Sequence, residues 1–226
     1  MSRFQAKIYA NKQKKMFFLT VLGALFACDF FSILPLKTVL SQLRVLLPVL
    51  YARPVVSGQD VLTYTHTFGS RVWPGDTDIF FHKNNIKYLE RCEVGRFSLM
   101  QKTGLASYLR CEKIHLGFSG INLRWRRELK FLQSFVVESR FAGWDDRCFY
   151  IEQRFVDART GFVHCQCHSV CKLASRGKAA NTTPAMILKC LSGLDDVEAV
   201  QMDKGLVFLS DMYNHSSAQL AKPKSE

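Results

Sequence analysis

One long helical pattern between extended runs is the feature that most limits how this chain can fold. Apolar residues recur at helical spacing from Ile86 to Met100, which predicts a single helix from Asn85 to about Thr103. Five extended runs surround it, at residues 61–72, 113–125, 132–142, 148–156 and 162–174. The alternation of side chains in these runs is typical of half-buried antiparallel strands, which turn-like segments at 143–146 and 157–161 join as hairpins. The predicted fold class is therefore α+β, with an antiparallel sheet of about five strands around one long helix.

A polar loop precedes this helix. Asp76 and Asp78 follow a Trp-Pro-Gly turn, and His82, Asn84 and Asn85 come directly before the helical pattern. Asparagine is a preferred N-cap residue, and a helix N-terminus offers free N–H donors at the positive end of its dipole. Such a site can polarise a carbonyl oxygen or hold an anion. The alternative is that the two aspartates only cap the loop and the helix, with His82 a hydrogen-bonded loop histidine.

Two charges interrupt the apolar face of the predicted helix. Glu93 and Arg96 project into the same angular sector as the apolar residues, so both are expected to be partly buried. An acid and a base at i and i+3 can neutralise each other, whereas a lone buried charge would be costly. We therefore predict a buried structural pair rather than a pair of acid–base catalysts.

These residues carry a resemblance to a known family. The pattern Gly75-Asp-x-Asp78, followed by His82-x-Asn84-Asn85 with Tyr88, Glu93 and Arg96, resembles hotdog-fold thioesterases of the 4-hydroxybenzoyl-CoA thioesterase type. It is also similar to plant acyl-carrier-protein thioesterases. A second stretch, Gly-Trp-Asp-Asp-Arg at 143–147 with the sequences at 149–150, 154–156 and 161–163, resembles a membrane-anchored branch of the hotdog proteins. Together the motifs extend the resemblance over roughly residues 17–215.

The resemblance implies a hotdog fold, in which the sheet wraps the helix, and a homodimer that acts on an acyl thioester. It implies that Asp78 is the catalytic carboxylate, acting as general base or nucleophile. His82 would orient Asp78 or a water, and Asn84 would hold the substrate or that water. The helix N-terminus around Asn84 and Asn85 would supply the donors for the thioester oxygen.

Bulky residues in the polar loop depart from the family pattern. Ile79, Phe80 and Phe81 stand where small residues would let a substrate approach. We assign Phe80 and Phe81 as candidate substrate-binding residues, with three alternatives open. They could narrow the pocket, line an acyl tunnel, or mark a hotdog protein that binds lipid without hydrolysing it.

Composition excludes several other functions. The net charge of +12 fits a cationic surface with a basic N-terminal tail, or attraction to anionic lipid headgroups and to the phosphates of coenzyme A. No nucleic-acid-binding motif accompanies this charge, so nucleic acid is not expected as a partner. No Gly-rich phosphate loop, serine nucleophile elbow or metal-ligand spacing is present, so neither a cofactor nor a metal is expected. The eight cysteines are expected to be mostly buried, without a disulfide framework.

The N-terminal region is expected to anchor the chain in a membrane. Residues 1–15 are polar and basic, and residues 16–36 form an apolar run, interrupted only by Asp29, that suits one transmembrane helix. A cleaved signal peptide is the rival, but the sequence before Cys28 lacks the small residue wanted three positions before the cut. Residues 37–54 form a juxtamembrane segment, and 55–175 the hotdog domain. The resemblance implies the endoplasmic reticulum membrane; a cleaved N-terminus would instead imply secretion.

The C-terminal region, residues 176–226, is predicted to be a linker, a short helix over 186–191 and a tail. Asn181 and Asn214 lie in glycosylation sequons, which matter only if the domain faces the lumen. The modest charge bias around the apolar run favours that lumenal side, whereas acyl-CoA is mainly cytosolic, so both orientations stay open. The leading hypothesis is a membrane-anchored thioesterase that cleaves a fatty acyl-CoA or a related thioester. The second is a catalytically silent lipid-binding protein in membrane lipid homeostasis, and the third is a structural membrane protein.

Overall fold

The computed structural model describes residues 54–56, 58, 60–174, 181–194 and 204–220. The chain divides into two units, Met1–Leu47 and Pro48–Glu226, and all described residues belong to the second. The predicted basic tail, membrane anchor or signal peptide, and almost all of the juxtamembrane segment therefore lie outside the described residues. Within the described part of the chain, no helix is both long and apolar enough to cross a membrane.

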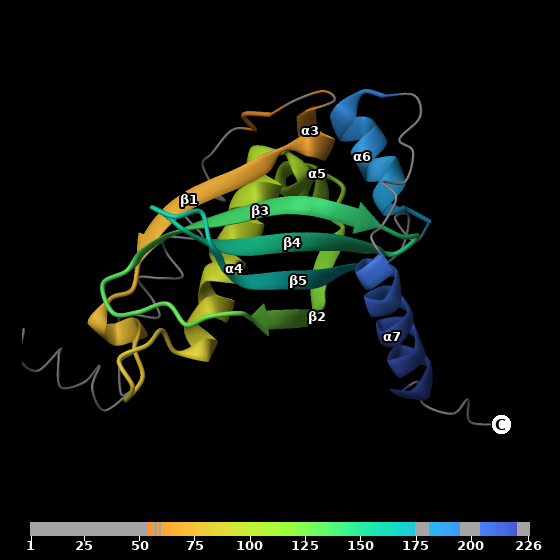
Figure 1. The fold of residues 1–226 in the computed structure, drawn as a ribbon. Coiled ribbons are helices and arrows are strands. Elements are labelled where there is room, and N and C mark those ends of the chain that lie inside the picture. Colours follow the sequence, from red (N-terminus) through yellow and green to blue (C-terminus); the bar gives the residue numbers. More distant parts are fainter. Residues whose placement is uncertain (1–53, 57, 59, 175–180, 195–203, 221–226) are drawn as a thin grey trace, which may run out of the picture. The chain divides into compact units, whose positions relative to one another are not determined.

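Five antiparallel strands form one sheet with the order β1-β3-β4-β5-β2 (Figure 1). The strands are β1 (Thr65–Arg71), β2 (His115–Trp125), β3 (Ser134–Trp144), β4 (Cys148–Asp157) and β5 (Val163–Ala174). Four of the five begin and end within two residues of the predicted runs, because their alternating pattern is a local signal. The first predicted strand is wrong at its start, since Asp60–Thr63 forms a short helix, α3. Its Val61 turns into the core as a helical residue.

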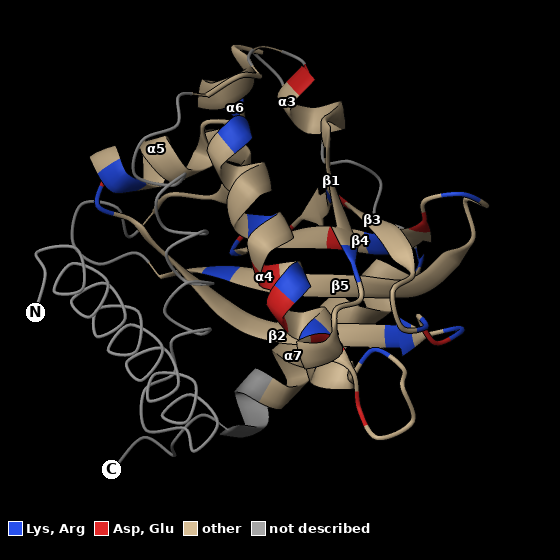
Figure 2. Cartoon of the chain, turned by 90° about the vertical axis from the view of Figure 1, so that its left-hand side faces the viewer, with Lys and Arg blue, Asp and Glu red and all other residues tan. Residues whose placement is uncertain are grey.

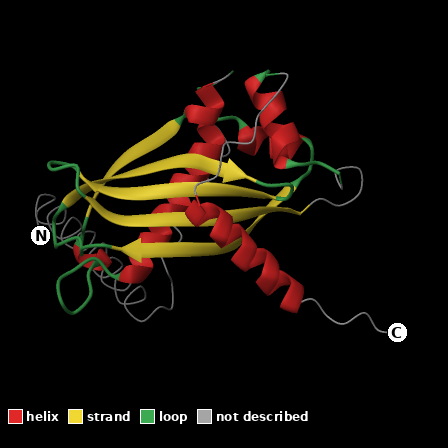
Figure 3. Cartoon of the chain, turned by 45° about the vertical axis from the view of Figure 1, so that its right-hand side comes forward, coloured by secondary structure: helices red, strands yellow, loops and turns green. Residues whose placement is uncertain are grey.

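The long helix α4 (Asn85–Lys102) lies along the concave face of the sheet, which curves around it (Figure 3). This confirms the predicted helix and its N-cap, since the Asn84 side chain accepts a hydrogen bond from the Ile86 N–H at 2.9 Å. The short helix α6 (Pro184–Ser192) was also predicted. Besides α3, two further helices were not predicted: α5 (Leu105–Cys111), which follows α4 directly, and α7 (Lys204–Leu220).

A thin polar layer crosses the apolar core where α4 meets the sheet. Gln153 on β4 donates from Nε2 to the Cys92 carbonyl oxygen at 2.9 Å and to Ser139 Oγ at 3.0 Å. Gly95 faces these groups, and a Cβ at this position would lie 2.5 Å from both the Gln153 Nε2 and Ser139 Oγ atoms. The absence of a side chain at Gly95 is therefore what lets the helix approach the sheet this closely.

Helix α7 covers one end of the opposite face of the sheet. Leu206, Leu209 and Tyr213 pack against Tyr150 and neighbouring apolar residues of β4 and β5. The turn between β3 and β4 contributes Asp145, whose Oδ2 accepts from the Tyr150 hydroxyl at 2.6 Å and from Ser210 of α7 at 3.3 Å. This turn is the structured hairpin predicted for the Gly-Trp-Asp-Asp-Arg motif, and it also holds the C-terminal helix on the sheet.

Candidate active site

The loop between β1 and α4 is fixed by Asp76. The Asp76 carboxylate is buried, accepts the Trp73 N–H at 3.2 Å, and lies 3.7 Å from Arg91 Nη2 and 3.9 Å from Lys83 Nζ. Its carbonyl oxygen also accepts the Asn84 N–H at 2.8 Å. Asp76 thus ties the loop to the start of α4, which is the structural role that the sequence left open for it.

Lys83 is buried beside this carboxylate. Its Nζ lies 5.5 Å from the centre of the Tyr88 ring and 5.4 Å from that of Phe135, and it has no hydrogen-bond partner among the described residues. Burial lowers the pKa of Lys83 to about 8, although the nearby Asp76 carboxylate opposes this shift. The Lys83 ammonium group is therefore held by its electrostatic contacts with the Asp76 carboxylate and the two aromatic rings.

Asp78 lies at the base of a tight hairpin. The Asp78 N–H donates to the His82 carbonyl oxygen at 2.9 Å, and residues Thr77 and Lys83 form a β-bridge below it. Asp78 Oδ1 accepts the N–H groups of Phe80 at 2.9 Å and His82 at 3.3 Å. Oδ2 has no hydrogen bond within the described residues, and the residue is only half-buried, so this oxygen is available to a water or a substrate.

The first turn of α4 offers a backbone N–H donor, at Asn85, which follows Asp78 closely in the sequence. Asn84 caps the Ile86 N–H with its side chain, and its carbonyl oxygen accepts the Lys87 N–H at 2.9 Å. The Asn85 N–H has no hydrogen bond within the described part of the chain. A free N–H at the positive end of a helix dipole is suited to bind a carbonyl oxygen that gains negative charge.

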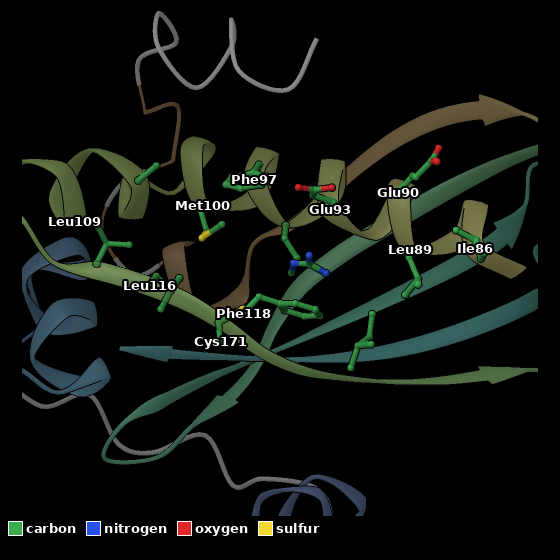
Figure 4. A pocket seen from close by; sticks show the side chains of 13 residues that line it. Ile86, Leu89, Glu90, Glu93, Phe97, Met100, Leu109, Leu116, Phe118 and Cys171 are labelled. Carbon is green, nitrogen blue, oxygen red and sulfur yellow. The ribbon is translucent and has the colours of Figure 1, made fainter. Parts of the chain in front are cut away.

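A groove of about 560 Å³ begins at this turn and runs between α4 and β2 (Figure 4). Figure 4 shows Leu89 and Met100 of α4 on the side of the helix that faces Phe118 and Leu116 of β2, whereas Glu90 points away from the strand. From Ile86 to Met100 the helix rises about 21 Å at ~1.5 Å per residue. Apolar side chains form most of the wall, and among the described residues the charged side chains that line it are those of Glu90, Glu93 and Arg96. The groove can therefore hold an extended apolar chain.

Comparison with known proteins identifies the family. The family model of the thioesterase-like superfamily matches residues 72–191. Protein THEM6 of Xenopus laevis is 31% identical over 212 residues, which cover 93% of this chain and 95% of that protein. The chain belongs to the thioesterase-like superfamily. The Danio rerio Protein THEM6 is 35% identical over 105 residues, covering 46% of this chain and 52% of that one.

A solved thioesterase-like structure shares the fold. The probable thioesterase YbaW from Escherichia coli superimposes with a TM-score of 0.51 at 16% identity, covering 56% of this chain and 96% of that one. At this identity the likeness concerns the fold alone. The resemblance to hotdog thioesterases that the sequence motifs indicated is confirmed, as is the hotdog arrangement of sheet and helix.

In this thioesterase-like chain, the predicted Glu93–Arg96 pair is wrong as an ion pair. The salt bridges of the described residues include none between them. Arg96 is buried; it donates from Nη1 to Ser169 Oγ at 3.1 Å, and its guanidinium lies 4.3 Å from the centre of the Phe118 ring. Partners from β5 and β2 replace Glu93 because Arg96 points into the domain. Both residues line the groove.

The remaining predicted residues lie at the surface of the thioesterase-like domain. Phe80 and Phe81 are 70% and 71% exposed at the hairpin tip, and neither lines the groove. Asn181 and Asn214 are also exposed. The groove residues of β2, such as Phe118, were not predicted from the sequence. The pattern of a strand shows which side chains share a face, but not that a gap is left between that face and a helix.

The described cysteines are all free. They are the buried residues 92, 148, 165, 167 and 171 and the exposed residues 111 and 190. Cys165 and Cys171 lie on the helix-facing side of β5, and burial raises their pKa to about 12 and about 11. Such thiols are unreactive at neutral pH and act as small apolar side chains, as predicted. Within the described residues, no cluster of His, Cys, Asp and Glu could hold a metal ion.

Proposed function

We propose that the protein is a thioesterase that hydrolyses a fatty acyl-CoA or a related long-chain acyl thioester. The observation that carries this proposal is the largely apolar groove along α4, which opens at the helix N-terminus next in sequence to the Asp78 hairpin. The acyl chain would lie along α4, with the thioester at the first turn. Membership of the thioesterase-like superfamily supports the same chemistry.

In the proposed reaction, Asp78 acts as the general base. Its Oδ2 takes a proton from a water molecule as the water oxygen bonds to the thioester carbonyl carbon. The Asn85 N–H and the α4 dipole stabilise the negative charge that forms on the carbonyl oxygen. The carbon–sulfur bond then breaks, the thiolate takes the proton from Asp78, and a fatty acid and a free thiol leave. His82 would position the water or Asp78, and Asn84 would keep the donor turn in place.

The test of the carboxylate uses the full chain in detergent micelles. Free-thiol release would be followed with acyl-CoA substrates of increasing chain length. Asp78→Asn is expected to lower turnover about 10²-fold or more, because the general base is lost. Asp146→Asn, in the exposed turn between β3 and β4, is the matched control and is expected to keep wild-type turnover. Turnover retained in Asp78→Asn would refute this active site.

The test of the groove uses its far end. Ala106 on α5 lines the groove there and is only half-buried, so a larger side chain can project into the cavity. Ala106→Phe is expected to lower kcat/KM for long acyl chains while leaving short chains nearly unaffected. Ser107→Phe, at the exposed neighbouring position outside the groove, is the control. An equal effect on all chain lengths would show that the acyl chain lies elsewhere.

A silent lipid-binding protein is the second candidate. It is favoured by one observation: two backbone N–H groups already occupy Asp78 Oδ1, as they would in a purely structural turn. This function predicts no turnover by the wild-type chain with any acyl-CoA. Binding of a fluorescent fatty acid, lost in Ala106→Phe but kept in Asp78→Asn, would then support it.

Homodimerisation and membrane anchoring complete the proposal. Among the described strands β2 is an edge strand, paired with β5 alone, and its exposed Phe118 and Trp125 border the groove side of the sheet. A second copy that pairs along β2 would continue the sheet and cover the groove. The apolar run at 16–36 supports an anchor in the endoplasmic reticulum membrane. Endoglycosidase sensitivity of glycans at Asn181 or Asn214 would test the lumenal side, and cross-linking of intact membranes would test the dimer.

A further inference from the structure

The tip of the Asp78 hairpin exposes three consecutive apolar side chains. Ile79 is 85% exposed, and Phe80 and Phe81 are exposed to 70% and 71%. None of them belongs to an apolar core cluster or lines the groove. Large apolar side chains that gather on a protruding tip, with polar residues around them, commonly mark an interaction site.

This tip is held in place by hydrogen bonds. Phe81 donates its N–H to the Asp78 carbonyl oxygen at 3.1 Å, and Phe80 donates to the Asp78 side chain at 2.9 Å. Phe81 has a positive φ of 58°, which a residue with a side chain adopts rarely and at some cost. The backbone thus keeps the three side chains outward, although turning them inward would remove apolar surface from water.

A second loop lies beside the tip and enlarges the apolar surface. Between β2 and β3, Phe131 donates its N–H to the Phe81 carbonyl oxygen at 3.1 Å, and Lys130 forms a β-bridge with His82. Phe131 is 41% and Leu132 47% exposed. Two loops that are distant in sequence therefore present one continuous surface, the apolar tip patch, made of residues 79–81 and 131–132.

Basic residues lie in the segment that runs from the end of β2 to the apolar tip patch. Arg124, Arg126, Arg127 and Lys130 are all exposed, with Glu128 the one acidic residue among them. Lys130 forms its β-bridge with His82 beside the tip, and the guanidinium groups of Arg126 and Arg127 lie 4.9 and 4.7 Å from the centre of the Phe162 ring. Figure 2 looks toward this end of the domain, where blue segments lie on and beside the loops. Apolar side chains bordered by lysine and arginine are the pattern by which proteins bind the surface of an anionic bilayer.

We propose that the apolar tip patch docks on an anionic phospholipid bilayer, with residues 79–81 entering the interface and the bordering arginines and Lys130 contacting lipid phosphates. A second copy of the chain fits less well, because a symmetric contact of this patch would bring the two sets of basic side chains together. Asp78 lies at the base of the same hairpin, and the groove begins five residues after its tip, at Ile86. Docking therefore places the proposed active site at the bilayer surface, where acyl chains are concentrated.

The test is site-specific photocross-linking of the full chain in vesicles of phosphatidylcholine and phosphatidylserine. The photoreactive residue is introduced as Phe80→p-benzoylphenylalanine, and in a control as Phe208→p-benzoylphenylalanine on α7. Phe208 is the matched control because it is 71% exposed, nearly the same as Phe80. The expected result is a lipid adduct several-fold more abundant at position 80 than at position 208. Equal lipid adducts at the two positions, or an adduct at position 80 mainly to a second copy of the chain, would overturn the proposal.

The charge contribution is tested in the same vesicles. Arg127→Gln combined with Lys130→Gln is expected to lower the lipid adduct at Phe80 several-fold, as should omission of phosphatidylserine. Lys189→Gln combined with Lys204→Gln, two exposed lysines on α6 and α7, should leave it unchanged. An equal fall in both double variants would overturn the assignment of the basic border. Neither readout requires turnover, so a failure of docking can be distinguished from a failure of the proposed hydrolysis.

Discussion

Replacing Gly95 with alanine tests how closely α4 approaches the sheet. The new Cβ would lie 2.5 Å from Gln153 Nε2 and 2.5 Å from Ser139 Oγ, both of them buried. Overpacking a filled core costs about 1–3 kcal/mol, and displacing the Gln153 amide from its two hydrogen bonds adds about 1–3 kcal/mol. Alanine regains ~1 kcal/mol of helix propensity over glycine. The free energy of unfolding should therefore fall by about 3 kcal/mol, which lowers Tm by about 6–12 °C for a chain of this size.

Thermal unfolding of the full chain in detergent, followed by circular dichroism, measures this effect. Gly69→Ala on β1 is the control, because no atom of the described residues lies within 4 Å of a Cβ at that position. A Tm for Gly95→Ala within about 2 °C of the control would refute the close approach. In a Ser139→Ala background, which removes one of the two colliding atoms, the cost of Gly95→Ala should be smaller. If the losses in stability from Gly95→Ala and Ser139→Ala simply add, the strain does not arise from contact with Ser139.

Three further predictions concern other parts of the domain. Gly120→Ala should increase amide hydrogen exchange across α7, since a Cβ there would lie 2.2 Å from the Tyr213 ring; Gly117→Ala, whose nearest atom is 3.7 Å away, should not. Because the pKa of Lys83 is lowered in the folded chain, the unfolded chain binds more protons than the folded chain between about pH 8 and 10.5. The free energy of unfolding should therefore rise with pH across that window. In denaturant titrations, Lys83→Met should flatten this rise. Asn84→Ala should lower the free energy of unfolding by about 1 kcal/mol because it removes the N-cap of α4, whereas Asn84→Ser should keep the cap and the stability. Turnover that stays low in Asn84→Ser would assign the Asn84 side-chain amide to catalysis.

Local signals account for the elements that could be predicted from the sequence. The helix from Asn85 and the strand from Cys148 begin at the predicted residues, because an N-cap asparagine and a period-two pattern act over a few neighbouring positions. Helix α7 was missed although Leu206, Leu209 and Tyr213 have helical spacing. That spacing is weak in a mixed polar tail, and the helix gains its packing only on the sheet.

Contacts between distant segments could not be predicted in the same way. Glu93 and Arg96 were correctly placed on the inner side of the helix, since angular position follows from helical geometry. The partners of Arg96, Ser169 and Phe118, come from strands 22 or more residues away in sequence, so no i,i+3 rule could identify them. Phe80 and Phe81 were open to three interpretations, because side-chain bulk does not show whether a loop turns inward or outward.

The sequence by itself determined the hotdog fold, the helix N-terminus with Asn84 as its cap, and the family, because each follows from short patterns of residue type and spacing. The tertiary structure alone decided that a groove opens between α4 and β2 and that the apolar tip patch is exposed. Both depend on the distance between elements that are remote in sequence. That distance is set by the whole packed core, including the missing side chain of Gly95 and the polar layer around Gln153.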